Sequence, residues 1–450
     1  MPLEKSTSVG NIKAKESQQE IYKHWQNRMM FFMMVAYAAS YFSRQNFPQA
    51  MGVMESSLGF TKLQLGNIVS IFGIIYGCGR FISGILGDQN SARLFLACGL
   101  FFSGLANIFM GFSSSLILLT LVWSLNSCFL STGAPACAKI ITHWFSPKEL
   151  ATKWALWSTS QQIGMALVSV VLAWALPRFG WKCAFFLPGG VSLVLSLLVY
   201  KGLRDKPEDL GLDTVEKFSG LSQANADECS KMTFSQILFK KVLRNKMVWA
   251  MGLANCFLYI TRMGFLTWAP IFLCQDKHIS FRSSGFMMGA FNIAGIIGAI
   301  LLGMLADKTF KGYRGRAGFT FMFGLALSVL GIWFVPSANP WVYLAAVLTF
   351  GFFVSGPQTM VGVAAVDFSS KRAAGAASGL TGTCGYVGTA LAGSGLALIE
   401  GKYGWTGVFA ALFSSALAGS LCFLATWNAR ARSLEASEKK TKKITLEKAA

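Results

Sequence analysis

The sequence predicts an all-α membrane protein with twelve transmembrane helices in two pseudo-symmetric six-helix bundles, and three observations lead to this prediction. The chain of 450 residues is 53% hydrophobic and only 13% charged, whereas about 25% of the residues in a typical soluble protein are charged. The apolar residues are gathered into twelve runs, which approach or exceed the roughly 20 residues that a helix needs to span a bilayer. The first six runs also resemble the last six in sequence.

The predicted spans divide six and six around a long polar segment. They cover residues 29–50, 65–86, 94–112, 116–141, 154–176, 181–200, 248–273, 283–305, 319–335, 341–366, 373–398 and 405–427. This pattern predicts bundles at 29–200 and 248–428, a cytoplasmic central loop at 201–247, and tails at 1–28 and 429–450. Because several spans are longer than the bilayer requires, we expect them to be tilted. The tails and the central loop show no sign of an independent fold, and we expect them to be solvated beside the lipid headgroups.

The net charge of +20 is distributed unevenly along the chain. In a soluble protein such a charge would indicate binding to nucleic acid. Here 31 of the 40 Lys and Arg residues fall in the tails, the central loop and the short loops of one side, and six fall in loops of the other side. This bias follows the positive-inside rule and predicts that both termini are cytoplasmic, so the expected partner is the lipid bilayer and not nucleic acid. The polar start of the chain lacks the pattern of a cleavable signal, and the first helix is expected to insert uncleaved.

The sequence gives no indication of a metal site, a cofactor or an enzymatic centre. Almost all of the ten Cys residues lie inside predicted helices, without the paired spacing of metal ligands or of a disulfide framework. No arrangement of nucleophile and base occurs in the predicted helices. We therefore expect a protein that is not an enzyme, and we expect it to be a monomer.

One pattern occurs twice along the chain. The tetrapeptide Tyr-Phe-Ser-Arg that ends at Arg44 matches Tyr-Ile-Thr-Arg, which ends at Arg262, and the two copies are offset by 218 in the numbering. Gly-x-x-x-Asp segments that end at Asp88 and Asp307 match at an offset of 219, and later matches drift only to 224. Matches in the same order at a nearly constant offset indicate a duplication with a pseudo-two-fold axis along the membrane normal. Transporters of this design bind their substrate between the halves, near the midplane of the membrane.

Three arginines lie inside predicted helices, namely Arg44, Arg80 and Arg262. Arg44 and Arg262 fall within roughly 6 Å of the midplane at 1.5 Å per residue, where an arginine costs about 2.5–3.5 kcal/mol on insertion scales. A structural ion pair would need a carboxylate, but no Asp or Glu occurs in the middle of a predicted helix. An anionic substrate is the remaining partner, and phosphate suits the planar, bidentate guanidinium best. Arg80 lies nearer the cytoplasmic end, where it can bind either the substrate or lipid headgroups.

Tyrosines share helix faces with these arginines. Helical spacing places Tyr37 and Tyr41 on one face with Arg44, and Tyr76 on another face with Arg80. Their hydroxyl groups can bond to phosphate or sugar oxygens. Packing against a neighbouring helix or placement at the membrane interface is the alternative interpretation.

Other polar groups are few in the predicted spans. Gln161 and Gln162 carry amides in the middle of a helix, and each can serve as a substrate ligand or as an interhelical hydrogen bond. We keep Gln161 as a candidate site residue. A proton-coupled symporter would normally need a titratable group within the membrane. All three His residues lie outside the middle of the spans, which argues against proton coupling.

The repeated Gly-x-x-x-Asp segments resemble the signature of the major facilitator superfamily. The first copy ends at Asp88 and is continued by Arg93, and the second ends at Asp307 and is continued by residues that include Arg316. The resemblance implies that these four residues act in gating, as a latch on the cytoplasmic side, and do not bind substrate. Gln89 stands where the first copy usually has a basic residue, which would weaken that latch.

Longer segments resemble the organophosphate:phosphate antiporters, most of all bacterial hexose-phosphate transporters that include chlamydial carriers. The matching segments surround Arg44, Arg80, His143, Arg262 and Tyr386 and run nearly from end to end of the chain. The resemblance implies a bacterial inner membrane protein that exchanges a sugar phosphate for inorganic phosphate by alternating access, with glucose 6-phosphate as the best candidate. It also implies that Arg44 and Arg262 bind phosphate, and it adds Tyr386 to the candidate site.

Two departures from the family pattern leave the organic part of the substrate open. Gln161 stands where the family commonly has a His, and Ser378 and Thr381 stand where some hexose-phosphate carriers have Asp and Lys. A glycerol-3-phosphate:phosphate antiporter therefore remains an alternative. A transporter-like sensor that binds sugar phosphate and signals to a membrane kinase is the second alternative, although the tails and the central loop contain no recognisable signalling module.

Overall fold

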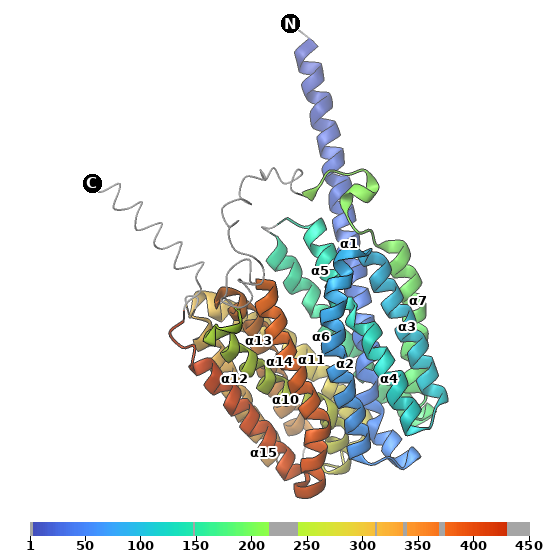
Figure 1. Ribbon diagram of the computed structural model, residues 1–450, viewed down its shortest axis with the longest axis vertical. Helices are drawn as coiled ribbons and strands as arrows, with labels where there is room; N and C mark the ends of the chain where they lie inside the picture. The colour runs from blue at the N-terminus through green and yellow to red at the C-terminus, as the bar shows by residue number, and fades with distance from the viewer. Residues whose placement is uncertain are drawn as a thin grey trace, which may run out of the picture.

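The helices form two bundles that stand side by side (Figure 1). The computed structural model describes residues 3–146, 149–215, 242–310, 313–335, 340–368 and 374–429, and no β-strand occurs among them. The first bundle contains α1 (Leu3–Leu58), α2 (Lys62–Gln89), α3 (Ala92–Phe112), α4 (Leu116–Ser131), α5 (Gly133–Trp144), α6 (Leu150–Phe179) and α7 (Cys183–Gly202). The second contains α10 (Lys246–Gln275), α11 (Phe281–Lys308), α12 (Arg314–Phe334), α13 (Pro340–Phe368), α14 (Ala374–Ala390), the π-helical segment η5 (Leu391–Gly395) and α15 (Leu396–Leu424). A short 3₁₀ helix, η1 (Pro207–Leu210), follows α7.

The two bundles repeat the same helix pairings. In the first, α1 packs against α6 and α7, α3 packs against α7, and α2 packs against α4. In the second, α10 packs against α14 and α15, α12 packs against α15, and α11 packs against α13. These pairings correspond one to one when the second half of the sequence is aligned on the first. The internal repeat is therefore a repeat of packing as well as of sequence, and the all-α fold of two equivalent bundles agrees with the prediction.

Nine segments of the described residues are long and apolar enough to span a membrane. One of them, Ala377–Leu424, is 48 residues long and covers most of the last two predicted spans, 373–398 and 405–427. Within it Gly404 has a φ of 65°, a left-handed conformation that favours glycine, and this kink divides α15. The predicted spans 29–50 and 65–86 lie within α1 and α2, which are not among the nine. The number of twelve spans stays a prediction.

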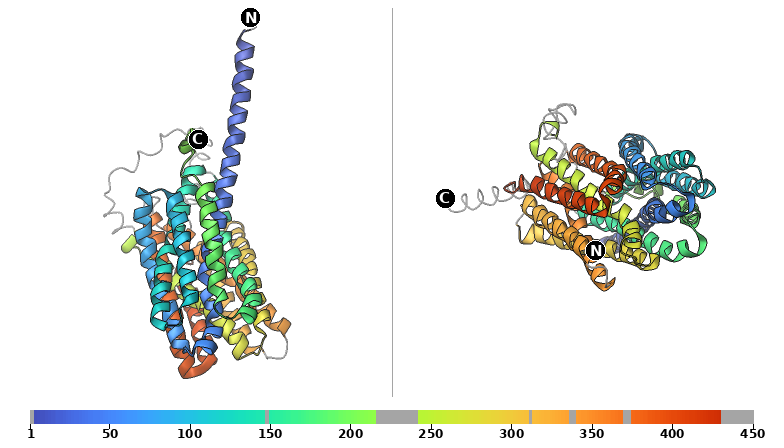
Figure 2. Two further views of the ribbon diagram at one scale, coloured as in Figure 1. Left: turned by 90° about the vertical axis from the view of Figure 1, so that its right-hand side faces the viewer. Right: turned by 90° about the horizontal axis from the view of Figure 1, so that it is seen from below.

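Three local features differ from the sequence-based expectation. Residues 3–28, which we expected to form a solvated tail, continue α1 as helix, because they are rich in helix-forming Lys, Glu and Gln. The start of this extension protrudes from the bundle (Figures 1 and 2), whereas its end packs against the bundle, where Gln26 Nε2 donates to the carbonyl of Trp144 at 2.7 Å. The predicted span 116–141 is interrupted at Thr132, whose Oγ1 donates to the carbonyl of Phe129 at 2.8 Å. The predicted span 373–398 contains η5, where the carbonyl of Ala392 accepts a hydrogen bond from Trp268 Nε1 at 2.9 Å.

Two pairs of helices form most of the contact between the bundles. They are α2 with α14 and η5, and α6 with α11. The hydrogen bonds that join the halves include Lys62 to Glu400 at 2.7 Å, near the start of α2. Among the described side chains of α2, the last such bond is from Arg80 to Tyr386 at 3.4 Å. We call the end from which α1 protrudes the predicted inner end and the opposite end the predicted outer end. The halves are thus closed against one another from the outer end to about the level of Arg80.

Candidate substrate site between the two bundles

Arg44 lies in the last third of α1 and Arg262 lies near the middle of α10, and these two helices pack against one another across the interface. Arg44 is 8% exposed and Arg262 is fully buried. The ion pairs found among the described residues are Lys62 with Glu400 and Lys277 with Asp276, and neither includes these arginines. Two guanidinium groups are therefore buried between the bundles without a carboxylate partner in the described part of the chain.

Arg44 is surrounded by aromatic rings. Its guanidinium carbon lies 4.3 Å from the ring centroid of Tyr76, 5.3 Å from that of Phe72, 5.4 Å from that of Tyr41 and 5.9 Å from that of Tyr386. Cation–π contacts of this kind are worth roughly 0.5–2 kcal/mol each, and they stabilise a buried cation without neutralising it. The net positive charge consequently remains available to an anion.

Arg262 depends on an amide. Its Nη2 donates to Oε1 of Gln162 at 3.3 Å, while Nε and Nη1 have no hydrogen-bond partner among the described residues. Unpaired donors on a buried charged group are unfavourable, and they indicate a position that another group can fill. Gln161, the amide that we kept as a candidate, is half-buried. The contact with Arg262 is made by its neighbour Gln162, which the sequence interpretation left out of the candidate site.

Arg80 extends the site toward the predicted inner end. Its Nη1 donates to the hydroxyl of Tyr386 at 3.4 Å, and the residue is exposed. The ring of Tyr386 lies 5.0 Å from that of Tyr76 and 6.0 Å from that of Tyr259. Tyr386 therefore connects Arg80 with the aromatic residues around Arg44.

Tyr259 belongs to the same aromatic group, and the sequence interpretation did not include it. Its hydroxyl accepts a hydrogen bond from Gln358 Nε2 at 3.1 Å. A signal for Tyr259 was available, because it stands in the second copy of the repeat at the position that Tyr41 has in the first. No comparable signal pointed to Gln358. The ring of Tyr37 packs against two aromatic residues, with its centroid 5.2 Å from that of Tyr41 and 4.3 Å from that of Trp157.

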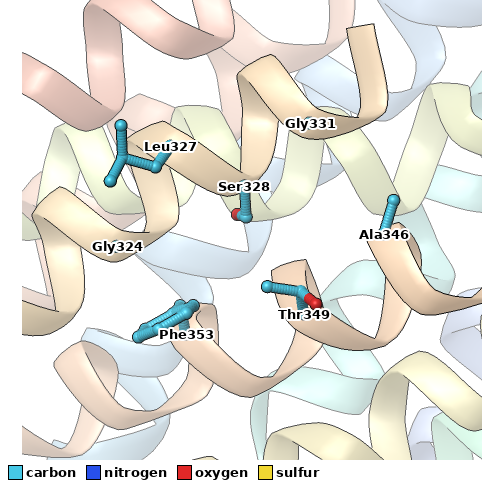
Figure 3. Close-up of a pocket in the computed structure, with 7 residues that line it drawn as sticks. All are labelled: Gly324, Leu327, Ser328, Gly331, Ala346, Thr349 and Phe353. Carbon is cyan, nitrogen blue, oxygen red and sulfur yellow. The ribbon is translucent and has the colours of Figure 1, made fainter. Parts of the chain in front are cut away.

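A small cavity of about 30 Å³ lies beside Arg44. It is lined by residues of both bundles, namely Arg44, Gln45, Pro48, Val69, Phe72, Trp123, Met263, Thr267 and Thr389. A larger cavity of about 270 Å³ lies between α12 and α13 and is lined by Gly324, Leu327, Ser328, Gly331, Ala346, Thr349 and Phe353 (Figure 3). The larger cavity carries no charged side chain, so it does not have the chemistry of an anion site.

The four predicted gating residues are described only in part. The side chains of Asp88 and Asp307 lie outside the described part of the structure. The guanidinium carbon of Arg93 lies 4.1 Å from the ring centroid of Tyr200, within the first bundle. Arg316 Nε donates to the carbonyl of Trp427 at 3.3 Å, within the second bundle. The gating role of all four residues stays a prediction.

Membrane-length helices in two equivalent bundles, with buried arginines between them, define a membrane transporter. A sequence profile of the Major Facilitator Superfamily matches residues 33–393. The chain belongs to the Major Facilitator Superfamily. The resemblance and the all-α major facilitator fold that the sequence predicted are confirmed, while the number of twelve spans stays a prediction.

Three proteins with sequences similar to this chain are named as a transport protein, a membrane sensor and an antiporter. A probable hexose phosphate transport protein of Chlamydia muridarum is 39% identical over 438 residues, which cover 95% of this chain and 96% of the relative. The membrane sensor protein UhpC of Salmonella typhimurium is 34% identical over 412 residues, covering 91% of this chain and 93% of the relative. The hexose-6-phosphate:phosphate antiporter of Escherichia coli is 32% identical over 436 residues, covering 92% of each chain.

A solved structure shares the fold. A bacterial homologue of the human lysosomal transporter Spinster, in an inward-facing and unoccupied conformation, superposes with a TM-score of 0.71 at 13% identity. The match covers 90% of this chain and 96% of that one. At this identity the likeness shows the fold alone.

Proposed function

We propose that the protein exchanges a sugar phosphate, with glucose 6-phosphate as the best candidate, for inorganic phosphate by alternating access. The observation that carries the proposal is Arg262, a fully buried guanidinium with Nε and Nη1 unpaired and no carboxylate beside it in the described residues. A phosphoryl group supplies oxygens and negative charge together, and guanidinium binds such groups in a bidentate manner. The relatives named as hexose phosphate transporters support the same substrate class.

The site residues take separate roles in this proposal. Arg44 and Arg262 hold the phosphoryl group from opposite halves, and Arg80 supplies a third positive charge toward the inner end. The hydroxyl groups of Tyr41, Tyr76 and Tyr386 are available to phosphate or sugar oxygens. Gln161 and Tyr37 are more peripheral candidates, because the described contacts do not bring them to either central arginine.

Exchange follows from the charge of the empty site. With no anion bound, closing the halves would bring uncompensated guanidinium groups into a medium of low dielectric constant, where charge repulsion is strong. A bound phosphate dianion offsets these charges, so the loaded site changes its access more readily than the empty one. The uneven Lys and Arg distribution supports a bacterial inner membrane location with both termini cytoplasmic.

Counterflow in liposomes tests the proposal. Purified protein is reconstituted with labelled phosphate inside, and release is measured into buffer that contains glucose 6-phosphate, glycerol 3-phosphate, phosphate or no phosphate ester. We expect rapid release with glucose 6-phosphate or phosphate outside and little release into buffer that lacks both. Equal release into the phosphate-free buffer would refute obligatory exchange, and preference for glycerol 3-phosphate would replace the substrate.

Two substitutions link the flux to the site. Arg44→Lys and Arg262→Lys should each lower exchange at least about tenfold, because lysine keeps the charge but loses the bidentate fork. Arg178→Lys is the matched control, since Arg178 is exposed and its described contacts are with Trp174, whose carbonyl accepts from Nη1 and whose ring centroid lies 4.4 Å from the guanidinium carbon. Wild-type rates in both site variants would refute their assignment.

A sensor is the second candidate function, and the similarity to the membrane sensor protein UhpC favours it. A sensor would bind the sugar phosphate at the same arginines without carrying it across the membrane. Saturable binding of glucose 6-phosphate together with no counterflow would decide for the sensor.

A further inference from the structure

Gln162 lies at the interface between the two halves. It is on α6, 9% exposed, and its amide makes two hydrogen bonds. Oε1 accepts from Arg262 Nη2 at 3.3 Å, and Nε2 donates to Ser355 Oγ of α13 at 3.1 Å. One amide of the first bundle therefore connects two helices of the second.

Gln162 and Tyr386 occupy equivalent positions in the repeat. The segments 163–167 and 387–391 match one another in sequence, and these two residues immediately precede them. The ring centroid of Tyr386 lies 5.9 Å from the guanidinium carbon of Arg44. Each of these equivalent positions thus places a neutral polar side chain against the central arginine of the opposite half.

An amide and a carboxylate would act differently at this position. The amide oxygen satisfies one of the five N–H donors of the guanidinium and fixes its direction, but it leaves the positive charge in place. Nε and Nη1 remain unpaired among the described residues. A carboxylate of the same length would form an ion pair and remove the charge that attracts the substrate.

We propose that Gln162 is a positioning residue for Arg262, and that the neutrality of its amide is what makes exchange obligatory. The inference rests on the proposed function and deepens it. Gln162 holds Arg262 ready for a phosphoryl group while it leaves the empty site positively charged. The empty carrier therefore does not return across the membrane, and each cycle requires an anion in both directions.

A purely structural interhelical bond is the competing interpretation of the same contact. Under that interpretation, a change at Gln162 lowers the amount of folded protein or the rate of exchange. It does not create a new flux in the absence of a substrate on the opposite side. Net flux therefore separates the two interpretations.

The experiment compares Gln162→Glu and Gln162→Met with wild-type protein in liposomes loaded with labelled phosphate. The control is Gln49→Glu, because Gln49 is another buried amide, and its Nε2 donates to Ser169 within the same half at 3.2 Å. The control adds the same carboxylate to the membrane interior at a position whose described partner is not an arginine. Release is measured with inorganic phosphate outside and into phosphate-free buffer.

We expect Gln162→Glu to release phosphate into phosphate-free buffer at least about tenfold faster than wild type, and its KM for phosphate to rise at least about tenfold, or about 1.4 kcal/mol. Gln162→Met should remain strictly an exchanger, with its KM raised about two- to tenfold because Arg262 loses the oxygen that orients it. Gln49→Glu should show neither the leak nor the change in KM.

Several results would overturn the inference. Strict exchange with the wild-type KM in Gln162→Glu would do so, and so would an equal leak in Gln49→Glu. If Gln162→Glu does not fold, an unchanged KM in Gln162→Met overturns the inference instead. If wild-type protein fails to exchange phosphate, the proposed function and this inference are refuted together. If wild-type protein exchanges phosphate and Gln162→Glu shows the same strict exchange and the same KM, the inference alone is refuted.

Discussion

The ion pair of Lys62 with Glu400 should stabilise the closure of the predicted outer end. Lys62 Nζ lies 2.7 Å from Glu400 Oε1, and the pair joins the start of α2 to α15 across the two halves. The side chains are 19% and 15% exposed, and Lys62 Nζ also lies 5.1 Å from the ring centroid of Trp405. Alternating access requires these contacts to break each time that the outer end opens.

The partial burial of the pair sets the free energy that it contributes to closure of the outer end. Exposed ion pairs contribute up to about 1 kcal/mol, and removal of one partner from a fully buried pair costs about 3–5 kcal/mol. We place Lys62 with Glu400 between these limits, nearer the first, at about 1–2 kcal/mol. Lys62→Met should then raise the ratio of outward-open to closed protein about five- to thirtyfold.

Cysteine labelling from outside the vesicle measures this ratio. Thr267 is 3% exposed and lines the small cavity beside Arg44, so a Thr267→Cys variant reports opening to a membrane-impermeant maleimide. The exposed Cys78 and Cys128 are first replaced by serine. The labelling rate of Thr267→Cys should rise about five- to thirtyfold when Lys62→Met is added. The double variant Lys62→Glu/Glu400→Lys, in which the two charges are swapped, should restore the slow labelling rate.

Lys402→Met serves as the control, because it removes one positive charge at an exposed position of the same end. Unchanged labelling in Lys62→Met would refute a role for the pair in closure. Labelling in the charge-swapped double variant that is as fast as in Lys62→Met would refute the assignment to this ion pair.

Two further predictions concern close contacts between the halves. Tyr386→Phe removes the hydroxyl that accepts a hydrogen bond from Arg80 at 3.4 Å, and a bond of this length is worth about 0.5–1 kcal/mol. The KM in phosphate counterflow should therefore rise about two- to fivefold. An unchanged KM would exclude a role for this bond in substrate binding. Gly66→Ala would place a Cβ 2.8 Å from the carbonyl oxygen of Gly393 and 3.1 Å from Ala397 Cβ, so α2 and η5 could no longer pack as closely. We expect faster labelling of the Thr267→Cys variant, and labelling at the original rate would show that the two backbones separate without cost.

The sequence predicted the fold because the bilayer imposes strong rules on composition. Apolar runs must be about as long as the membrane is thick, and the offset between Arg44 and Arg262 revealed the duplication. The continuous α1, the break at Thr132 and the π-helical η5 were not predicted. The extension of α1 reflects the helix propensity of a polar segment, which a search for apolar runs does not register. The break at Thr132 and η5 each involve contacts of one or two residues, such as Trp268 with the carbonyl of Ala392, and hydrophobicity averaged over a span does not register such contacts either.

The candidate site was predicted best where it rests on charge. The sequence could single out Arg44, Arg80 and Arg262, because an arginine inside a membrane is costly and no Asp or Glu lies in the predicted spans to pair with it. The choice between Gln161 and Gln162 could not be made in the same way. Neighbouring residues of a helix point about 100° apart, as follows from 3.6 residues per turn, and the rotation of α6 that directs Gln162 to Arg262 is set by packing against α11.

The repeat would have distinguished the two glutamines, and it also shows where the halves diverge. Equivalent positions of the two copies carry Gln162 and Tyr386, each against the arginine of the other half. The amide of Gln162 accepts one hydrogen bond from Arg262. The ring of Tyr386 instead lies beneath the guanidinium of Arg44, and its hydroxyl accepts a hydrogen bond from Arg80. Two equal partners would suit a symmetric anion such as inorganic phosphate alone. Because the partners differ, the two sides of the proposed site differ in shape and in hydrogen bonding. We therefore expect an asymmetric ligand, which carries an organic group on one phosphate oxygen, to have a preferred orientation there.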